Sequence, residues 1–234
     1  MRIDRIFLVC YTGYADRAER LREAVEPYLR PLGAKTETVW QFPSPWEKWI
    51  LDRVPHIPFL DSHPGCFGAS VGHYRAIKTA YELGSQGALI LEDDARFRKG
   101  VDIALALAKA PGDADCLMLD HFADKEPAGV ADGGWKRVRG AYSSACYAVS
   151  RPALQELVRA YEAPTAPREG PGADPVRTCD NFTHEDYLRG CRIYVAEPNL
   201  AVQCLCPGES NCGRRHCLGK YERMGVNLKD FDGF

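Results

Sequence analysis

The stretch Ala88-Leu89-Ile90-Leu91-Glu92-Asp93-Asp94 decides the interpretation of this sequence. An unbroken apolar run of this length is typical of a strand buried on both faces, as in a parallel sheet. Three acids follow the run directly, so the strand ends in a cluster of carboxylates. Ligands of open α/β sheets bind outside the carboxyl ends of the strands. The stretch therefore predicts an α/β fold with a polar site at this strand end.

The rest of the chain repeats the alternation of strands and helices. Short apolar runs predict strands at residues 3–10, 36–40, 116–119, 142–149 and 193–196. Apolar residues at helical spacing predict helices over 16–29, 68–83, 101–110, 151–161 and 180–189. Asp120-His121 follow one of these strands, so a second polar pair is expected at the same edge of the sheet. This order predicts an open, mostly parallel sheet flanked by helices.

Three segments do not fit this alternation. Residues 43–64 and 163–174 are rich in proline, and 124–139 is rich in glycine and charged residues. We expect the first two to be irregular loops and the third to be a surface excursion.

Length and composition indicate one ordinary globular domain. The chain has 234 residues, of which 45% are hydrophobic and 26% charged, and its net charge is -2. A charge so close to zero excludes a global attraction to nucleic acid or anionic membranes. We expect residues 1–203 to form the main domain and the cysteine-rich segment 204–234 to pack on it.

No stretch approaches the roughly 20 apolar residues that are needed to span a bilayer. The apolar run after Met1 is too short for a signal peptide and has no small-residue cleavage site behind it. We expect a cytoplasmic protein whose membrane contacts, if any, are peripheral.

The carboxylate cluster Glu92-Asp93-Asp94 is costly unless a positive charge compensates it, because adjacent acids raise one another's pKa. Mg²⁺ or Mn²⁺ is the natural compensation, since these cations take one or two carboxylates and leave other positions to diphosphate oxygens and water. A solvated acidic turn that caps the following helix is the alternative.

The sequence around this cluster resembles glycosyltransferase family 25, which includes lipooligosaccharide galactosyltransferases and collagen galactosyltransferase domains. The resemblance is carried by residues 65–73 (Gly-Cys-Phe-Gly-Ala-Ser-Val-Gly-His), by 88–94, by 141–154 and by 193–203, and it spans about residues 3–203. It departs at Gly72, where the family usually has serine, and in the cysteine-rich tail.

The resemblance implies a GT-A-like fold, a nucleotide-sugar donor, most simply a UDP-sugar, and Mn²⁺ or Mg²⁺ as cofactor. It makes Asp94 the first candidate for a metal ligand, with Asp93 and Glu92 contacting ribose, metal or backbone. Arg17 and Arg20 would then approach the nucleotide; their alternative is an ordinary charged helix surface.

The resemblance also places His73 near the donor, where it could form a hydrogen bond; a satisfied structural histidine is the alternative.

An inverting transfer needs a carboxylate that takes a proton from the acceptor hydroxyl. Glu185-Asp186 resembles the Glu-Asp motif of inverting GT-A enzymes, whose aspartate is the base. Asp180 lies where family 25 places an aspartate. Asp186 is therefore the first candidate for the catalytic base and Asp180 the second; an acidic first turn of a helix explains Glu185 equally well.

The cysteines fall into two groups. Widely spaced cysteines in apolar surroundings are expected to be buried free thiols: Cys10, Cys66, Cys116, Cys146, Cys179 and Cys191. A second group crowds into a short hydrophilic segment that also holds a histidine: Cys204, Cys206, Cys212, His216 and Cys217. Four such ligands satisfy tetrahedral Zn²⁺, so we expect a structural zinc, with disulfides as the alternative.

The function that these features favour is the transfer of a hexose, galactose or glucose, from a nucleoside-diphosphate sugar to a hydroxyl of a glycan, a protein or a hydroxymethylated DNA base. A metal-dependent nucleotidyl- or phosphotransferase is the first alternative. A non-catalytic, zinc-stabilised binding module is the second.

Overall fold

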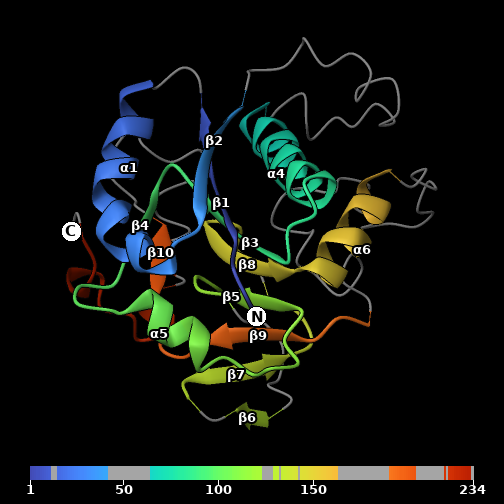
Figure 1. Cartoon of the computed structure of the whole chain (residues 1–234). Coiled ribbons are helices and arrows are strands. Elements are labelled where there is room, and N and C mark those ends of the chain that lie inside the picture. The colour runs from blue at the N-terminus through green and yellow to red at the C-terminus, as the bar shows by residue number, and fades with distance from the viewer. Residues whose placement is uncertain are drawn as a thin grey trace, which may run out of the picture.

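The computed structural model describes residues 1–11, 15–41, 64–122, 129–131, 133–141, 143–162, 190–203, 219 and 221–232. Its main sheet has eight strands in the order β2-β1-β3-β8-β5-β9-β7-β6 (Figure 1). The strands are β1 (Arg5–Tyr11), β2 (Lys35–Gln41), β3 (Gly87–Glu92), β5 (Cys116–Met118), β6 (Gly129–Ala131), β7 (Trp135–Val138), β8 (Cys146–Ser150) and β9 (Ile193–Ala196).

The sheet is mixed. β2, β1 and β3 are parallel neighbours, and β5 and β9 are parallel to each other. β8 lies between β3 and β5 and is antiparallel to both, so β3, β5 and β9 run in the same direction. β7 is antiparallel to β9 and pairs with β6. The predicted open α/β sheet is confirmed, with β8 and β7 as its reversed strands.

Helices cover both faces of the sheet (Figure 1). α1 (Ala15–Leu29) and α5 (Ile103–Ala108) pack on one face, and α4 (Pro64–Glu82) and α6 (Arg151–Glu162) on the other. Side chains of β1 alternate between the two cores, Ile6 and Leu8 facing the first and Phe7 and Val9 the second. A strand with an apolar side chain at each position is thus buried on both sides.

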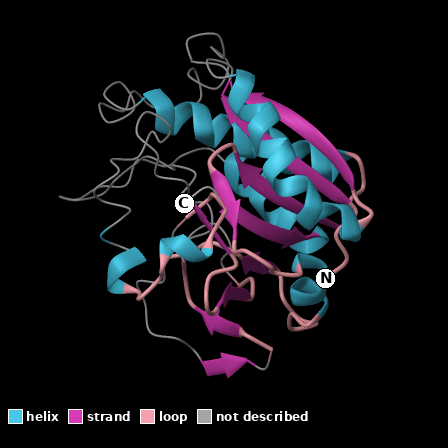
Figure 2. Cartoon of the chain, turned by 90° about the vertical axis from the view of Figure 1, so that its left-hand side faces the viewer, coloured by secondary structure: helices cyan, strands magenta, loops and turns pink. Residues whose placement is uncertain are grey.

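The predicted surface excursion over 124–139 is partly wrong. β6 and β7 lie within it and extend the sheet at the edge seen at the bottom of Figures 1 and 2. Trp135 is buried and its Nε1 donates a hydrogen bond to the carbonyl of Ala106 at 3.1 Å. The two strands are only three and four residues long, and β7 carries a lysine and an arginine, so neither contains an apolar run long enough to predict a strand.

A second, two-stranded sheet joins β4 (Ala95–Phe97) and β10 (Ala201–Gln203) in antiparallel fashion. Its first strand, β4, directly follows the acidic triplet in the chain, and the sequence did not predict this small sheet. The 3-10 helix η2 (Arg30–Leu32) follows α1, and η3 (Leu228–Asp230) lies near the carboxyl terminus.

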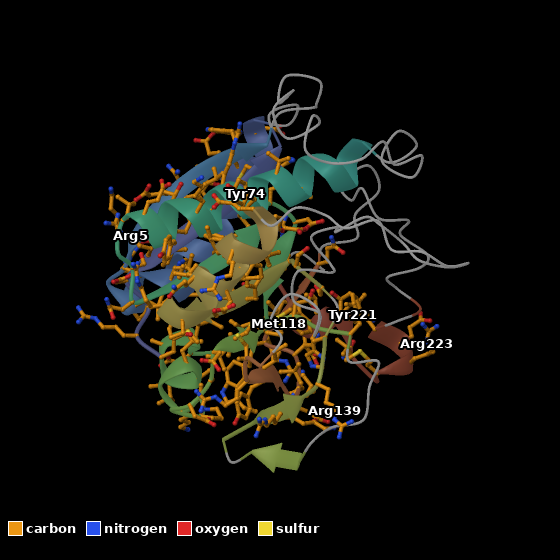
Figure 3. The ribbon with its side chains drawn as sticks, turned by 90° about the vertical axis from the view of Figure 1, so that its right-hand side faces the viewer. Arg5, Tyr74, Met118, Arg139, Tyr221 and Arg223 are labelled. Carbon is orange, nitrogen blue, oxygen red and sulfur yellow. The ribbon has the colours of Figure 1, made fainter. Side chains whose placement is uncertain are left out.

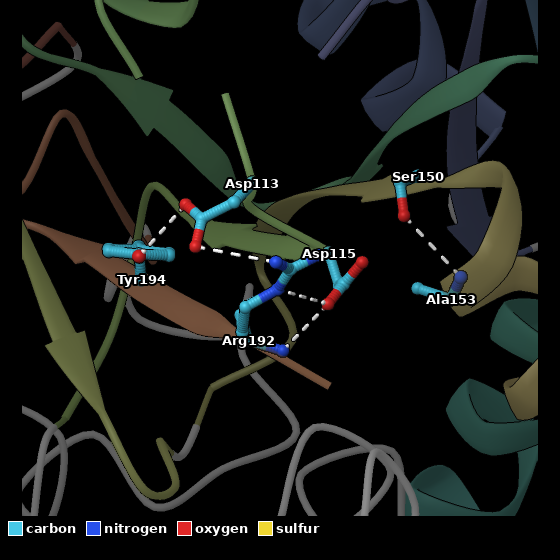
Figure 4. A network of polar contacts seen from close by, with 6 residues as sticks. All are labelled: Asp113, Asp115, Ser150, Ala153, Arg192 and Tyr194. Carbon is cyan, nitrogen blue, oxygen red and sulfur yellow. Dashed lines mark hydrogen bonds and ion pairs between the residues drawn. The ribbon is translucent and has the colours of Figure 1, made fainter. Parts of the chain in front are cut away.

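A polar network closes the amino ends of β5 and β9 (Figure 4). Asp115 accepts a hydrogen bond from Nε of Arg192 at 3.1 Å, and Asp113 accepts one from the hydroxyl of Tyr194 at 3.0 Å. In the described part of the chain, no helix has the length and apolar character needed to cross a bilayer.

Candidate active site at the carboxyl ends of the strands

Three strand ends meet at one edge of the sheet, opposite the network of Figure 4. Because β3, β5 and β9 run in the same direction and β8 runs against them, three carboxyl ends and the start of β8 share this edge. We call it the carboxyl edge. The polar residues that it holds in the described chain include Glu92, Asp93, Asp94, Asp120, His121, Ser143, Ser144 and Asn199.

Asp93 and Asp94 form the turn between β3 and β4 and are both buried, at 8% and 4% exposure. Arg96 stabilises this turn, because its Nη1 donates to the carbonyl of Ala95 at 2.8 Å and to that of Asp93 at 3.4 Å. Two adjacent buried carboxylates are unfavourable unless positive charge or hydrogen bonds compensate them. Their hard oxygen atoms are the ligands that Mg²⁺ and Mn²⁺ prefer.

Among the described residues, no three His, Cys, Asp or Glu side chains gather closely enough to hold a metal ion by themselves. A metal ion held by Asp93 and Asp94 would need further ligands, which a diphosphate and water could supply. Mg²⁺ is commonly bound in this way.

Glu92 is partly buried, and neighbouring side chains bind its carboxylate. Its Oε1 lies 2.9 Å from Nε2 of His73 and also accepts a hydrogen bond from the hydroxyl of Ser144. His73 is fully buried, and its Nδ1 lies 2.8 Å from the hydroxyl of Tyr147. Both ring nitrogens are thus engaged within the fold, which is the arrangement of a structural histidine. His73 could contact a donor only by giving up one of these partners.

Asp120 follows β5 and is completely buried. Its Oδ2 accepts a hydrogen bond from Ser143 at 2.5 Å, and its Oδ1 accepts bonds from Asn199 at 3.1 Å and Tyr221 at 2.9 Å. Burial raises the pKa of Asp120 to about 7; the three donors oppose this shift and the charge of Glu92 adds to it. Asp120 thus joins four separate segments through one carboxyl group.

His121 is the next residue and differs in its environment. Its Nε2 donates a hydrogen bond to the carbonyl of Ala196 at 2.9 Å, and burial lowers its pKa to about 4. The imidazole is therefore neutral at physiological pH. Its Nδ1 is buried and has no hydrogen-bond partner in the described chain.

The C-terminal segment 221–232 reaches the same edge. The hydroxyl of Tyr221 accepts a hydrogen bond from the backbone N–H of Gln203 at 2.8 Å and donates one to Asp120. The ring of Tyr221 lies 4.8 Å from that of Phe122 and joins a small apolar cluster with Val202 and Phe231. Figure 3 shows Tyr221 in the region of Met118, the last residue of β5.

Ser143 has a backbone φ of +122°, the one positive φ of a non-glycine residue in the described chain. Such a conformation is unfavourable for residues with a Cβ atom. Ser143 and Ser144 are both buried, and their hydroxyl groups reach two different carboxylates, Asp120 and Glu92.

The two arginines expected near the nucleotide lie on α1, which follows β1. Arg20 is about half exposed and its Nη2 lies 3.1 Å from Oδ2 of Asp16, one turn earlier. Arg17 lies on the same helix. The contacts described for α1 do not distinguish a nucleotide-binding role of the two arginines from an ordinary charged helix surface.

The remaining predicted site residues lie outside the described chain. They are the candidate bases Asp180 and Asp186 and the candidate zinc ligands Cys204, Cys206, Cys212, His216 and Cys217. Both assignments stay predictions. Of the cysteines expected to be buried free thiols, Cys116 and Cys146 are so, Cys191 is free and partly buried, and Cys10 is buried. The side chain of Cys66 and the whole of Cys179 lie outside the described residues.

Sequence reasoning placed Asp120 and His121 at a strand end but did not identify their partners. Ser143, Ser144 and Asn199 lie in two segments that carry the family resemblance, 141–154 and 193–203, but the resemblance assigns them no role. Tyr221 lies outside those segments, and position at the carboxyl edge is the further signal for the other three, since each serine precedes β8 and Asn199 follows β9.

Comparison with solved structures shows what fold this is. The chain is similar to a glycosyltransferase involved in the glycosylation of the major capsid of PBCV-1, with a TM-score of 0.50 at 15% identity over 95% of this chain and 99% of that chain. This likeness confirms the GT-A-like α/β fold class. A Drosophila β1,4-galactosyltransferase 7 mutant in complex with manganese, UDP-Gal and xylobiose has a TM-score of 0.41 at 10% identity, over 86% of this chain and 71% of that chain. No protein-family model and no curated protein sequence matches the chain.

Proposed function

We propose that this chain is a metal-dependent glycosyltransferase. It transfers a hexose, galactose or glucose, from a UDP-sugar to a hydroxyl of a glycan, a protein or a hydroxymethylated DNA base. The observation that carries the proposal is the pair of buried carboxylates, Asp93 and Asp94, at the carboxyl edge of a fold shared with a glycosyltransferase. The resemblance to family 25 around residues 65–94 supports the same activity.

In this proposal Asp94 and Asp93 would hold Mn²⁺ or Mg²⁺, which neutralises charge on the departing nucleoside diphosphate. Glu92 would fix the end of β3 through its bonds to His73 and Ser144, and beside the metal it would contact ribose, metal or backbone. Arg17 and Arg20 approach the nucleotide from α1.

The acceptor hydroxyl loses its proton to Asp186, or to Asp180, as its oxygen attacks the anomeric carbon. The bond from that carbon to the diphosphate oxygen breaks, and UDP leaves with the bonding electrons. Attack from the face opposite the leaving group inverts the configuration of the sugar.

A donor screen tests the proposal. Thermal unfolding would be followed with UDP, UDP-galactose, UDP-glucose and GDP-mannose, each with MnCl₂ or with EDTA. A donor at one hundred times its Kd stabilises the folded state by about 2.7 kcal/mol, which raises Tm by about 5–10 °C in a protein of this size. We expect this rise with a UDP-sugar only when Mn²⁺ is present.

The products of slow donor hydrolysis then separate the reaction classes. A glycosyltransferase releases UDP and free sugar, whereas a nucleotidyltransferase acting on the same donor releases UMP and sugar phosphate. If no sugar nucleotide gives a Mn²⁺-dependent shift and no UDP is released, the proposed function is wrong.

A further inference from the structure

The segment before β8 is unusually constrained at one residue. Ser143 is buried and holds a φ of +122°, which a residue with a side chain keeps only when its surroundings impose it. The hydroxyl of Ser143 donates to Oδ2 of Asp120 at 2.5 Å and accepts a bond from the backbone N–H of Ala145 at 3.3 Å. These two hydrogen bonds stabilise Ser143 in its unfavourable backbone conformation.

The next residue, Ser144, contacts the carboxylate of Glu92. Ser144 donates its hydroxyl to Glu92, and the backbone N–H of Glu92 donates to the carbonyl of Ala145 at 2.9 Å. The end of β3 is therefore bound to this segment through both its side chain and its main chain. Asp93 and Asp94 follow immediately in the chain.

Strain of this kind gathers at sites that must hold a fixed geometry. The regular pairing of β8 with β3 and β5 begins only at Cys146, so this strand pairing does not account for the positive φ of Ser143. At this strained residue the chain directs two consecutive hydroxyl groups, those of Ser143 and Ser144, to carboxylates at the ends of two different strands, β5 and β3.

We propose that Ser143 is a positioning residue for the transfer reaction: its hydroxyl, bonded to Asp120, fixes the backbone from which Ser144 holds Glu92 and thereby the turn of Asp93 and Asp94. The inference rests on the proposed function, because it assigns Ser143 to the geometry of that donor site. Ser143 acts through its neighbours and does not contact the sugar nucleotide.

Two substitutions at this position separate strain from positioning. Ser143→Gly removes the hydroxyl and relieves the strain, since glycine adopts positive φ readily. Ser143→Ala removes the hydroxyl and keeps the strain. We expect Ser143→Gly to have a Tm about 2–4 °C above that of Ser143→Ala.

Activity should not follow stability. Both variants are expected to lower kcat for Mn²⁺-dependent hydrolysis of UDP-galactose and UDP-glucose by about tenfold or more, because small misplacements of reacting groups cost that much. The KM of the donor should change by less than about threefold, since the nucleotide would keep its other contacts. A merely structural role would instead restore kcat in the more stable glycine variant.

Ser150→Ala is the matched control. Ser150 is the last residue of β8 and lies at the edge of the sheet opposite the carboxyl edge. Its hydroxyl accepts a hydrogen bond from the backbone N–H of Ala153 at 3.4 Å (Figure 4). This variant should keep wild-type kcat. Wild-type kcat in Ser143→Gly, with the wild type active, overturns the positioning role and leaves the proposed function intact. A wild type that hydrolyses neither donor overturns the proposed function instead.

Discussion

The hydroxyl of Tyr221 donates a hydrogen bond to Oδ1 of Asp120 at 2.9 Å, although the two residues are 101 positions apart in the chain. The same hydroxyl accepts the backbone N–H of Gln203, the last residue of β10. This phenol group is thus one of the contacts that attach the C-terminal segment to the carboxyl edge, beside the packing of the Tyr221 ring on Phe122.

The first prediction concerns this attachment. Tyr221→Phe keeps the aromatic packing but leaves a buried carboxylate and a backbone N–H each short of one partner. We expect it to lower the free energy of unfolding by about 1–3 kcal/mol. Tyr194→Phe is the control, because Tyr194 donates to Asp113, whose side chain is half exposed, and water can replace that bond. Urea denaturation of both variants measures the difference; equal losses would contradict the prediction.

The second prediction concerns the pH dependence of stability. The pKa of Asp120 rises from 3.8 to about 7 on folding, so the native state binds this proton more tightly than the unfolded state. The contribution of Asp120 to the free energy of unfolding is therefore largest below about pH 4 and falls as the pH rises toward 7. His121 has the opposite sign, because its pKa falls from 6.5 to about 4 and its contribution grows over that interval.

Asp120→Asn isolates the first of these effects. The amide removes the charge but still offers an acceptor to Asn199 and Tyr221. The groups that face Asp120 are Glu92, Ser143, Asn199 and Tyr221, and the buried thiol of Cys146 lies close enough to feel its charge. The difference in unfolding free energy, wild type minus variant, should fall between pH 4 and pH 7. A difference that is constant across this range would show that Asp120 titrates normally.

The third prediction concerns the carboxylates at the proposed binding site for the sugar-nucleotide donor. Asp94→Asn keeps the size of the side chain and removes one charge from the candidate metal site. We expect loss of the Mn²⁺-dependent rise in Tm with UDP-sugars and a decrease of about a hundredfold or more in donor hydrolysis. Asp113→Asn, at the opposite end of the sheet, should leave both unchanged. If Asp94→Asn keeps wild-type activity, Asp94 is not a ligand of the catalytic metal.

The fourth prediction concerns the catalytic base. Asp186→Asn should lower kcat for transfer by about 10²–10⁴-fold, the range of general-base catalysis, while the Tm shift with donor and Mn²⁺ persists. Asp180→Asn made in parallel decides between the two candidates. If neither substitution affects kcat, the base lies on another residue.

The fifth prediction concerns the cysteine-rich segment. Purified protein should contain one zinc ion per chain by elemental analysis, and replacing Cys204 and Cys206 together by serine should remove it, because only three of the five candidate ligands then remain and tetrahedral Zn²⁺ needs four. Protein that is free of zinc and loses thiol titre under oxidising conditions would support the disulfide alternative.

The amino-acid sequence by itself determined the layers of this protein. Apolar runs such as 88–91 can be satisfied only by burial on both faces, and helical stripes such as that of α6 must cover a sheet. It also placed Asp93, Asp94 and Asp120 at strand ends, because a polar residue that follows a buried strand marks the point where the strand leaves the core. The very short strands β6 and β7 escaped prediction, since pairing stabilises them, β7 with β9 and β6 with β7, and their own composition does not.

Only the tertiary structure decided what those acids contact. Strand order puts β8 between β3 and β5, and this brings the serines before β8 within reach of Glu92 on one side and Asp120 on the other. Tyr221 arrives from the far end of the chain. Hydrophobic periodicity records which faces are buried but not which strands are neighbours. The triplet was therefore visible in the sequence, whereas the bonds of Ser144 to Glu92 and of Ser143 to Asp120 depend on contacts between segments that no local pattern encodes.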